Sequence, residues 1–181
     1  MFTKGDLLIS EPFLNDPNFS RSVILICEHN TEGSLGFVLN QTSQIVLEDL
    51  GDEFENIDVP VYIGGPVEHN TLHFIHTLGD KIENSVKINE NYFWSGNFQQ
   101  VIKLLKLEII KPNQIRFFLG YSGWSKGQLA KEYEAKTWMR IENFQDDLFE
   151  LEATNLWRQV LRIKGGKFKE ISNYPTDPRL N

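Results

Sequence analysis

Short runs of apolar and β-branched positions, separated by clusters of Asn, Asp, Gly and Pro, fill the first hundred residues of the chain. Runs of this length between turn-forming residues predict strands joined by tight turns. A short helix or a single turn is expected at residues 45–50. Strands are expected at residues 7–9, 23–28, 36–39, 59–63, 71–77 and 92–94.

The second half of the chain alternates between helical and extended patterns. Asn97 is a favourable N-cap, and the apolar positions after it follow a helical stripe that ends before Pro112. Ser125, with Gln128 three residues later, fits a capping box and predicts that a helix opens at Ser125. A last helix is expected around residues 156–161. Strands are expected at residues 114–120 and 138–141.

Composition places the chain among ordinary globular domains. It has 181 residues, of which 40% are hydrophobic and 24% are charged, enough for one domain with a substantial core. No repeat or linker interrupts the pattern. The sequence therefore predicts a single α+β domain over residues 1–173 and a loosely held tail over residues 174–181, where two prolines replace any periodicity.

The net charge and the hydropathy of the chain argue against certain classes of partner and certain cellular locations. The 18 Lys and Arg against 25 Asp and Glu give a net charge of -7, which opposes non-specific attraction to nucleic-acid phosphates. The purely aliphatic and Cys run at residues 23–27 is far shorter than the roughly 18 residues that a membrane span needs. The first residues also lack the positive cluster of a secretory signal. We expect a cytoplasmic protein without a membrane span and without direct nucleic-acid contact.

A nucleophile motif occurs between a predicted strand and a predicted helix. The segment GWSKG at residues 123–127 matches G-x-S-x-G, with Ser125 as the candidate nucleophile. In α/β-hydrolases, however, the catalytic histidine follows the serine in the chain, and all four histidines here precede Ser125. A helix cap accounts for Ser125 without special chemistry. Hydrolysis at Ser125 is therefore the weaker alternative.

Other residues with reactive side chains do not form a recognisable site. His69, His73 and His76 would share a helix face and could bind a metal there, but the local alternation predicts a strand, on which His73 and His76 point to opposite faces. Cys27 lies in an apolar run, so we expect a buried hydrophobic side chain there and not an activated thiolate. The glycine-rich turns match no dinucleotide or Walker motif. We expect no metal and no cofactor.

A candidate binding surface remains at the glycine-rich turns and the start of the helix that follows Trp124. Free N–H groups at a helix N-terminus favour anions, so a protein or a small anionic ligand is the expected partner. The Trp124 indole either anchors this surface or fills the core, and both readings stay open. Gly123 is expected to adopt a positive φ or to lie against a close neighbour where the strand turns into the helix. The candidate residues are Gly65, Ser122, Trp124, Ser125 and Gln128.

Several blocks together resemble one protein family. GDLLISEPFLNDPNFSRSVILICEH, GSLGFVLNQ, GGPVEHNTLHFIH and FFLGYSGWSKGQLAKEYEAKTW occur in an order and spacing similar to the AlgH/YqgE family of bacterial proteins. The resemblance implies bent, bifurcated and mostly antiparallel β-sheets packed by three to four helices. It implies no known reaction, because the family is largely uncharacterised.

One branch of that family is named as a transcriptional regulator of alginate synthesis, although it has no evident DNA-binding domain. The family pattern commonly carries another residue where Ser125 stands, which further weakens the hydrolase alternative. The sequence is therefore expected to encode a non-catalytic binding or regulatory module. A transcriptional regulator and a hydrolase using Ser125 are the alternatives.

Overall fold

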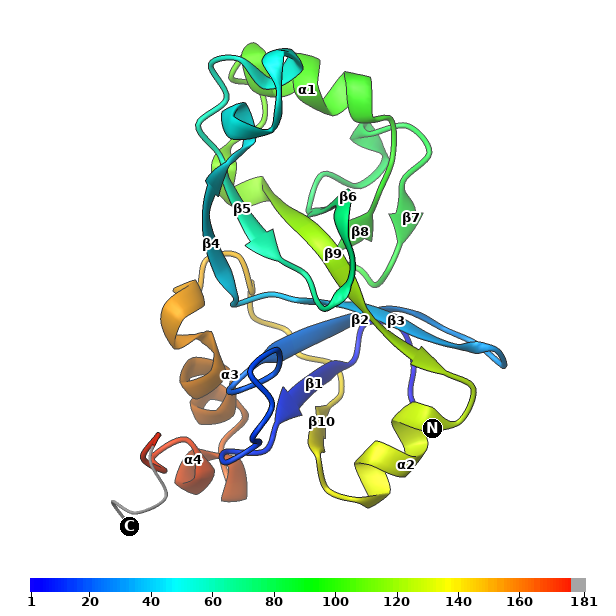
Figure 1. The fold of residues 1–181 in the computed structure, drawn as a ribbon, viewed down its shortest axis with the longest axis vertical. Coiled ribbons are helices and arrows are strands. Elements are labelled where there is room, and N and C mark those ends of the chain that lie inside the picture. The colour runs from blue at the N-terminus through cyan, green and yellow to red at the C-terminus, as the bar shows by residue number, and fades with distance from the viewer. Residues whose placement is uncertain (177–181) are drawn as a thin grey trace.

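The longest strand, β9 (Ile115–Ser125), crosses the middle of the molecule in the computed structural model, which describes residues 1–176 (Figure 1). Its first half pairs with β5 and β6, and its second half pairs with β3. At the boundary, Gly120 has a φ of +67°, and a Cβ there would lie 2.6 Å from the carbonyl oxygen of Val67. Glycine is required at this bend because other residues would suffer both strain and a clash.

Around β9, ten strands of residues 1–176 form one connected sheet in the order β10-β1-β2-β3-β9-β6-β8-β7, with β5 beside β9 and β4 beside β5. All pairings between these strands are antiparallel except the parallel pairing of β5 with β9. The remaining strands are β1 (Leu7–Ser10), β2 (Val23–His29), β3 (Gly33–Val38), β4 (Thr42–Val46), β5 (Pro60–Ile63), β6 (Val67–His76), β7 (Val86–Lys87), β8 (Phe93–Trp94) and β10 (Trp138–Ile141).

Four helices within residues 1–176 cover the sheet and make the fold α+β, as predicted. α1 lies over the half built from β4 to β8, while α2, α3 and α4 lie around the half that contains β1, β2 and β10 (Figure 1). The helices are α1 (Phe98–Lys106), α2 (Gln128–Glu134), α3 (Leu156–Lys164) and α4 (Lys167–Ile171). None of the helices within residues 1–176 is long and apolar enough to cross a membrane.

The local predictions are confirmed where a strong signal exists. The Asn97 side chain accepts a hydrogen bond from the backbone N–H of Gln100 at 3.1 Å and caps α1, as expected. A single 3₁₀ turn at Leu47–Leu50 matches the turn expected there. The strands β4 and β7 were not expected. The first three residues of β4 are polar and its last two, Ile45 and Val46, were assigned to the turn that follows, while β7 has only two residues.

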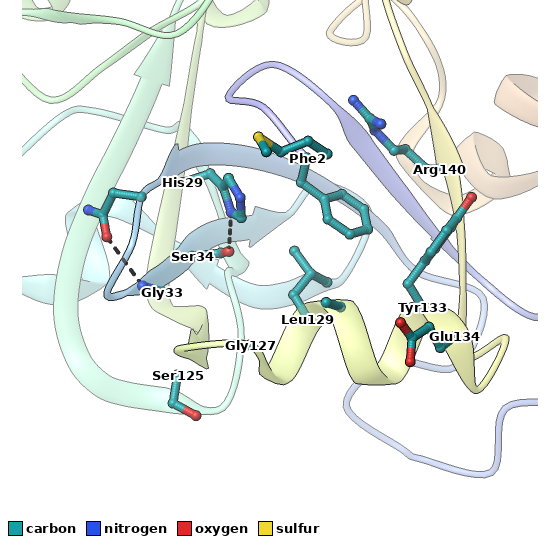
Figure 2. Close-up of a pocket in the computed structure, with 13 residues that line it drawn as sticks. Phe2, His29, Gly33, Ser34, Ser125, Gly127, Leu129, Tyr133, Glu134 and Arg140 are labelled. Carbon is teal, nitrogen blue, oxygen red and sulfur yellow. Dashed lines mark hydrogen bonds between the residues drawn. The ribbon is translucent and has the colours of Figure 1, made fainter.

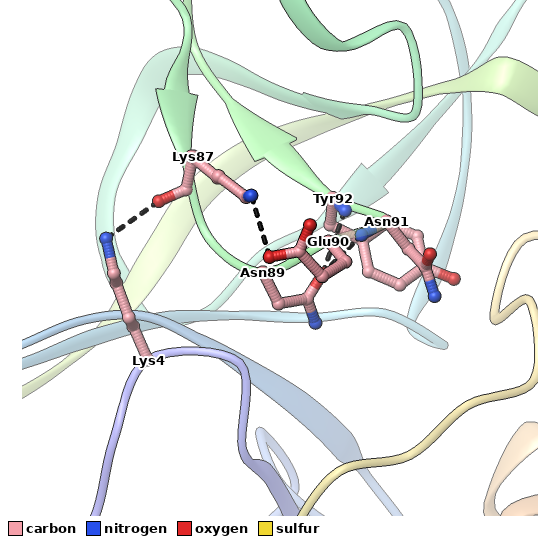
Figure 3. Close-up of polar contacts among 6 residues, drawn as sticks. All are labelled: Lys4, Lys87, Asn89, Glu90, Asn91 and Tyr92. Atoms are coloured by element: carbon pink, nitrogen blue, oxygen red, sulfur yellow. Dashed lines mark hydrogen bonds and ion pairs between the residues drawn. The ribbon is translucent and has the colours of Figure 1, made fainter.

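The connection between β7 and β8 shows how polar side chains close a short hairpin (Figure 3). The Asn89 Oδ1 accepts hydrogen bonds from the backbone N–H groups of Asn91 and Tyr92, both at 2.9 Å. The Lys4 ammonium donates to the carbonyl oxygen of Lys87 at 2.9 Å and joins the start of the chain to this hairpin. This hydrogen bond ties the segment that leads into β1 to the hairpin in the other half of the sheet.

Near the other end of the chain, two arginines hold the backbone that follows α4. Arg21 and Arg158 both donate to the carbonyl oxygen of Tyr174, at 2.9 and 3.2 Å, and the Tyr174 ring stacks on Phe13. The predicted loose tail began at Tyr174, but its residues 177–181 lie outside the described part of the chain. For those residues the prediction stays open.

Candidate functional site

The five candidate residues divide into a buried group and an exposed pair. Ser122 has no exposed surface, and its Oγ donates to the carbonyl oxygen of Gly64 at 3.1 Å. Gly65 is also buried, and a Cβ at this position would lie 2.4 Å from the backbone of Tyr121. These residues join the β5–β6 connection to β9. Because both residues are buried, they offer no surface to a partner.

Trp124 belongs to the core, which settles the two readings that the sequence left open. Its indole is 6% exposed and packs edge to face against Trp138, with the ring centroids 6.0 Å apart. Both indole N–H groups donate to Oε2 of Glu132 at 2.8 Å, and Oε1 of the same carboxylate accepts from Gln128 at 2.9 Å. Glu132 therefore connects α2 to two strands, and the candidate surface has no aromatic anchor at Trp124.

The capping box predicted at Ser125 is wrong. β9 continues through Ser125, and α2 begins at Gln128 with Gly127, in the left-handed region at a φ of +73°, as its N-cap. The Oε1 of Gln128 accepts hydrogen bonds from the backbone N–H of Ser125 at 3.0 Å and from its Oγ at 3.1 Å. Gln128 thus reaches back as in a capping box, while the serine hydroxyl caps nothing.

The turn from strand to helix that was expected at Gly123 is also absent. Gly123 pairs with Leu35 of β3 and has no positive φ, because the β3 partner keeps β9 extended up to Ser125. A Cβ at Gly123 would lie 3.3 Å from the ring of Tyr121, so the expected close neighbour exists but is a side chain. The positive φ occurs three residues earlier, at Gly120.

Next to Ser125 the surface is hollowed by a cleft of about 300 Å³, here named the α2 cleft (Figure 2). Its walls come from the start of the chain, the β2–β3 hairpin and α2, and Figure 2 shows the Phe2 ring directed between them. The cleft is lined by Met1, Phe2, His29, Asn30, Gly33, Ser34, Ser125, Gly127, Leu129, Ala130, Tyr133, Glu134 and Arg140.

Polar groups in the α2 cleft are held in place by neighbours. The Nδ1 of His29 lies 2.7 Å from the Oγ of Ser34, within hydrogen-bond distance (Figure 2). Arg140 pairs with Asp6 and with Glu142, each at 2.7 Å, and its guanidinium lies 5.2 Å from the centre of the Phe2 ring. These contacts fix the orientation of the side chains before any ligand arrives.

The other reactive side chains are dispersed. His73 lies among aromatic rings between the two halves, where burial lowers its pKa and Glu68 offsets part of that effect. Burial raises the pKa of the Cys27 thiol well above its ordinary value, which opposes thiolate chemistry. Across residues 1–176, no group of three or more His, Cys, Asp or Glu residues could hold a metal ion.

His76 occupies the opposite face of β6 and has no exposed surface. Its Nδ1 accepts from the backbone N–H of Leu78 at 3.3 Å, and its Nε2 lies 3.1 Å from the carbonyl oxygen of Ser95. These partners require a neutral ring with the proton on Nε2. Burial lowers the pKa of His76, while the bond to Ser95 acts in the other direction.

The sequence analysis did not identify several of the residues that line the α2 cleft. Phe2 and Arg140 carry no motif, and Asp6 pairs with Arg140 across 134 positions of the chain. Only His29 had a local signal, because it follows the apolar run of β2 at the predicted end of a strand. Ser125 is the one member of the predicted set that lines the cleft.

Comparison with known proteins identifies the family. The family model described as AlgH-like matches residues 7–169. A UPF0301 protein from Chlorobium limicola is 40% identical over 177 residues, covering 98% of this chain and 95% of the relative. One from Cytophaga hutchinsonii is 40% identical over 182 residues, covering both chains fully.

Two solved structures have the same fold. The AlgH protein from Pseudomonas aeruginosa superposes with a TM-score of 0.69 at 25% identity, covering 95% of this chain and 94% of that one. A Corynebacterium diphtheriae protein superposes with a TM-score of 0.76 at 22% identity, covering 96% of this chain and 93% of that one, and supports the fold alone. Because the family model spans most of the chain and the relatives match it from end to end, this protein belongs to the AlgH-like family.

Proposed function

We propose that this protein is a non-catalytic binding module whose ligand occupies the α2 cleft. The observation that carries the proposal is the lining of the cleft, which combines the buried apolar side chains of Phe2 and Leu129, here called its floor, with polar side chains that include His29 and Arg140, here called its rim. Small-molecule sites combine these features: a concave apolar surface and a few polar groups in fixed positions. Its volume of about 300 Å³ suits a small molecule.

The charges around the cleft favour an uncharged ligand over the anion expected from the sequence. Within residues 1–176 the lining carries two cations, the Arg140 guanidinium and the α-ammonium of Met1, but Asp6 and Glu142 pair with Arg140, and Glu134 adds a third carboxylate. Two cations against three carboxylates leave a net negative charge at the cleft, which disfavours an anion. An uncharged molecule with an apolar body and a hydrogen-bonding group matches both the floor and the rim.

The alternatives have less support. Ser125 is exposed and its hydroxyl bonds to Gln128 rather than to a histidine, while Cys27 is buried with a raised thiol pKa. Catalysis at either residue would need a base or a thiolate within reach. A DNA-contacting regulator would need a basic surface, and the chain has a net charge of -7.

Two probes of the same shape, benzamide and benzoate, test the proposal. We expect benzamide to shift the amide NMR signals of Leu129 and Ala130, with benzoate binding at least tenfold more weakly because of the local carboxylates. Ala130→Leu fills the cleft and should abolish the shifts. Ala135→Leu adds the same volume at an exposed position outside the cleft lining and should preserve them.

Two results would contradict the proposal. If benzamide caused the same shifts in Ala130→Leu as in the unmodified protein, the binding would lie elsewhere. If benzoate bound more tightly than benzamide, the charge argument would be wrong, and the anionic ligand expected from the sequence would regain support.

A further inference from the structure

One edge of the sheet is open at β10. The strand pairs with β1 on one side, in an antiparallel register that sets Trp138 opposite Ser10 and Met139 opposite Ile9. The backbone N–H of Glu11 donates to the carbonyl oxygen of Thr137 at 3.0 Å, so the backbone groups of Thr137, Met139 and Ile141 face β1. Those of the two residues between them, Trp138 and Arg140, must face away from the sheet.

These outward groups are available for a further strand. Within residues 1–176, the backbone N–H and carbonyl groups of Trp138 and Arg140 form no hydrogen bond with another segment. An edge strand with unpaired backbone groups is a template for an added strand. Proteins blunt such edges with a covering element or use them to bind extended peptides.

The open edge lies in a second hollow of about 470 Å³, here named the β10 groove. Tyr133 and Glu134, at the end of α2, form one wall, and Phe168 and Ile171 of α4 form part of the other. In Figure 1, β10 lies between α2 and α4. The walls bring the apolar groups of Tyr133, Phe168 and Ile171 next to any strand placed against β10.

The charge of the groove differs from that of the whole molecule. Lys136 and Lys167 are exposed and line it, and neither forms an ion pair with a carboxylate of residues 1–176. Arg140 also lines the groove but is compensated by Asp6 and Glu142. Among residues 1–176, Glu134 is the one carboxylate that lines the groove. Because the two lysines have no carboxylate partner within residues 1–176, acidic side chains placed next to them meet complementary charge, whereas basic side chains are repelled.

We propose that the β10 groove binds an extended acidic peptide segment of another protein, which adds to the sheet as a strand antiparallel to β10. Its backbone would pair with Trp138 and Arg140, and its acidic side chains would meet Lys136 and Lys167. A second copy of the chain fits less well. Its own β10 is recessed between two helices in the same way, so the helices would meet before the two strands could pair.

The test uses the acetylated and amidated peptide EVDVEVD and the ¹⁵N-labelled full chain. With saturating peptide, hydrogen exchange at the amides of Trp138 and Arg140 should slow at least tenfold, because both become bonded. The amide of Met139 already faces β1 and should exchange at an unchanged rate. The peptide KVKVKVK, with the same apolar positions, should bind at least tenfold more weakly.

Matched variants distinguish the loss of positive charge in the groove from a general effect of the substitutions on folding. Lys136→Asn combined with Lys167→Glu should weaken binding of EVDVEVD at least tenfold. Asparagine is chosen at Lys136 because the backbone there has a φ of +63°, which asparagine tolerates. Lys103→Asn combined with Lys106→Glu makes the same charge change on α1, in the other half of the molecule, and should leave binding unchanged.

Three outcomes would overturn the proposal. Binding of EVDVEVD without protection of Trp138 and Arg140 would place the peptide elsewhere. Equal affinity for KVKVKVK would remove the charge argument. Protection of the two amides without peptide, rising with protein concentration, would identify a second copy as the occupant. None of these readouts depends on Ala130, so failure here is distinguishable from failure at the α2 cleft.

Discussion

Replacing Glu132 with alanine tests whether one carboxylate holds α2, and with it the α2 cleft, on the sheet. The change removes the acceptor of two indole N–H groups, on Trp124 and Trp138, which are 6% and 3% exposed. A hydrogen bond to a charged group contributes about 1.5–3 kcal/mol, and a buried donor without a partner bears the cost of desolvation. Two such bonds give roughly 3–6 kcal/mol.

Because Glu132 is itself half-buried, water can partly replace it, and we expect a loss at the lower end, about 3 kcal/mol in the free energy of unfolding. Urea unfolding followed by far-UV circular dichroism measures this loss. Glu134→Ala is the matched control, since Glu134 lies on the same helix, is exposed and forms no side-chain hydrogen bond within residues 1–176. It should change stability by less than about 0.5 kcal/mol.

A double-mutant cycle with Trp124→Phe refines the result. The phenylalanine removes one indole N–H, so the cost of Glu132→Ala should fall by about half in this background. The reasoning is refuted if Glu132→Ala and Glu134→Ala unfold at the same urea concentration. It is also refuted if the cost of Glu132→Ala is unchanged when Trp124 is absent.

Two further predictions concern pH and glycine. Burial lowers the pKa of His76, so its proton binds more readily in the unfolded chain, and stability should be complete above about pH 6.5 and decline below it. Part of this decline in the urea midpoint should disappear in His76→Gln; an identical decline would exclude His76 as its source. Gly120→Ala should cost more than about 2 kcal/mol, because its φ of +67° and the carbonyl 2.6 Å from a Cβ leave no room. Gly123→Ala should cost less than about 1 kcal/mol, since its close neighbour is a side chain, and equal losses in the two variants would contradict this difference.

Where one element carries its own signals, the sequence was sufficient. Asn97 and the apolar stripe after it specify α1, because the cap and the periodicity act over a few residues. The apolar positions of residues 138–141 likewise predicted β10 with its observed ends. The quoted blocks also predicted the AlgH-like fold, which the family model and the solved structures confirm.

The errors fall where a distant partner overrides a local signal. Ser125 and Gln128 have the spacing of a capping box, but pairing with β3 keeps the chain extended through Ser125 and moves the start of α2 to Gln128. Trp124 could not be assigned from sequence for the same reason. Whether an indole is exposed depends on what lies against it, and here that is Trp138 and Glu132.

The sequence by itself determined the fold class, most elements and the net charge, since these follow from composition and from patterns a few residues long. Which side chains come together at the candidate sites was determined by the tertiary structure alone. Arg116 reads as one polar position in a strand, yet it is 6% exposed, with its guanidinium 4.7 Å from the ring centres of both Tyr62 and Phe149. Arg140 finds Asp6 across 134 positions of the chain. The α2 cleft and the β10 groove arise from such contacts, which no local pattern encodes because the interacting residues meet only after the sheet has formed.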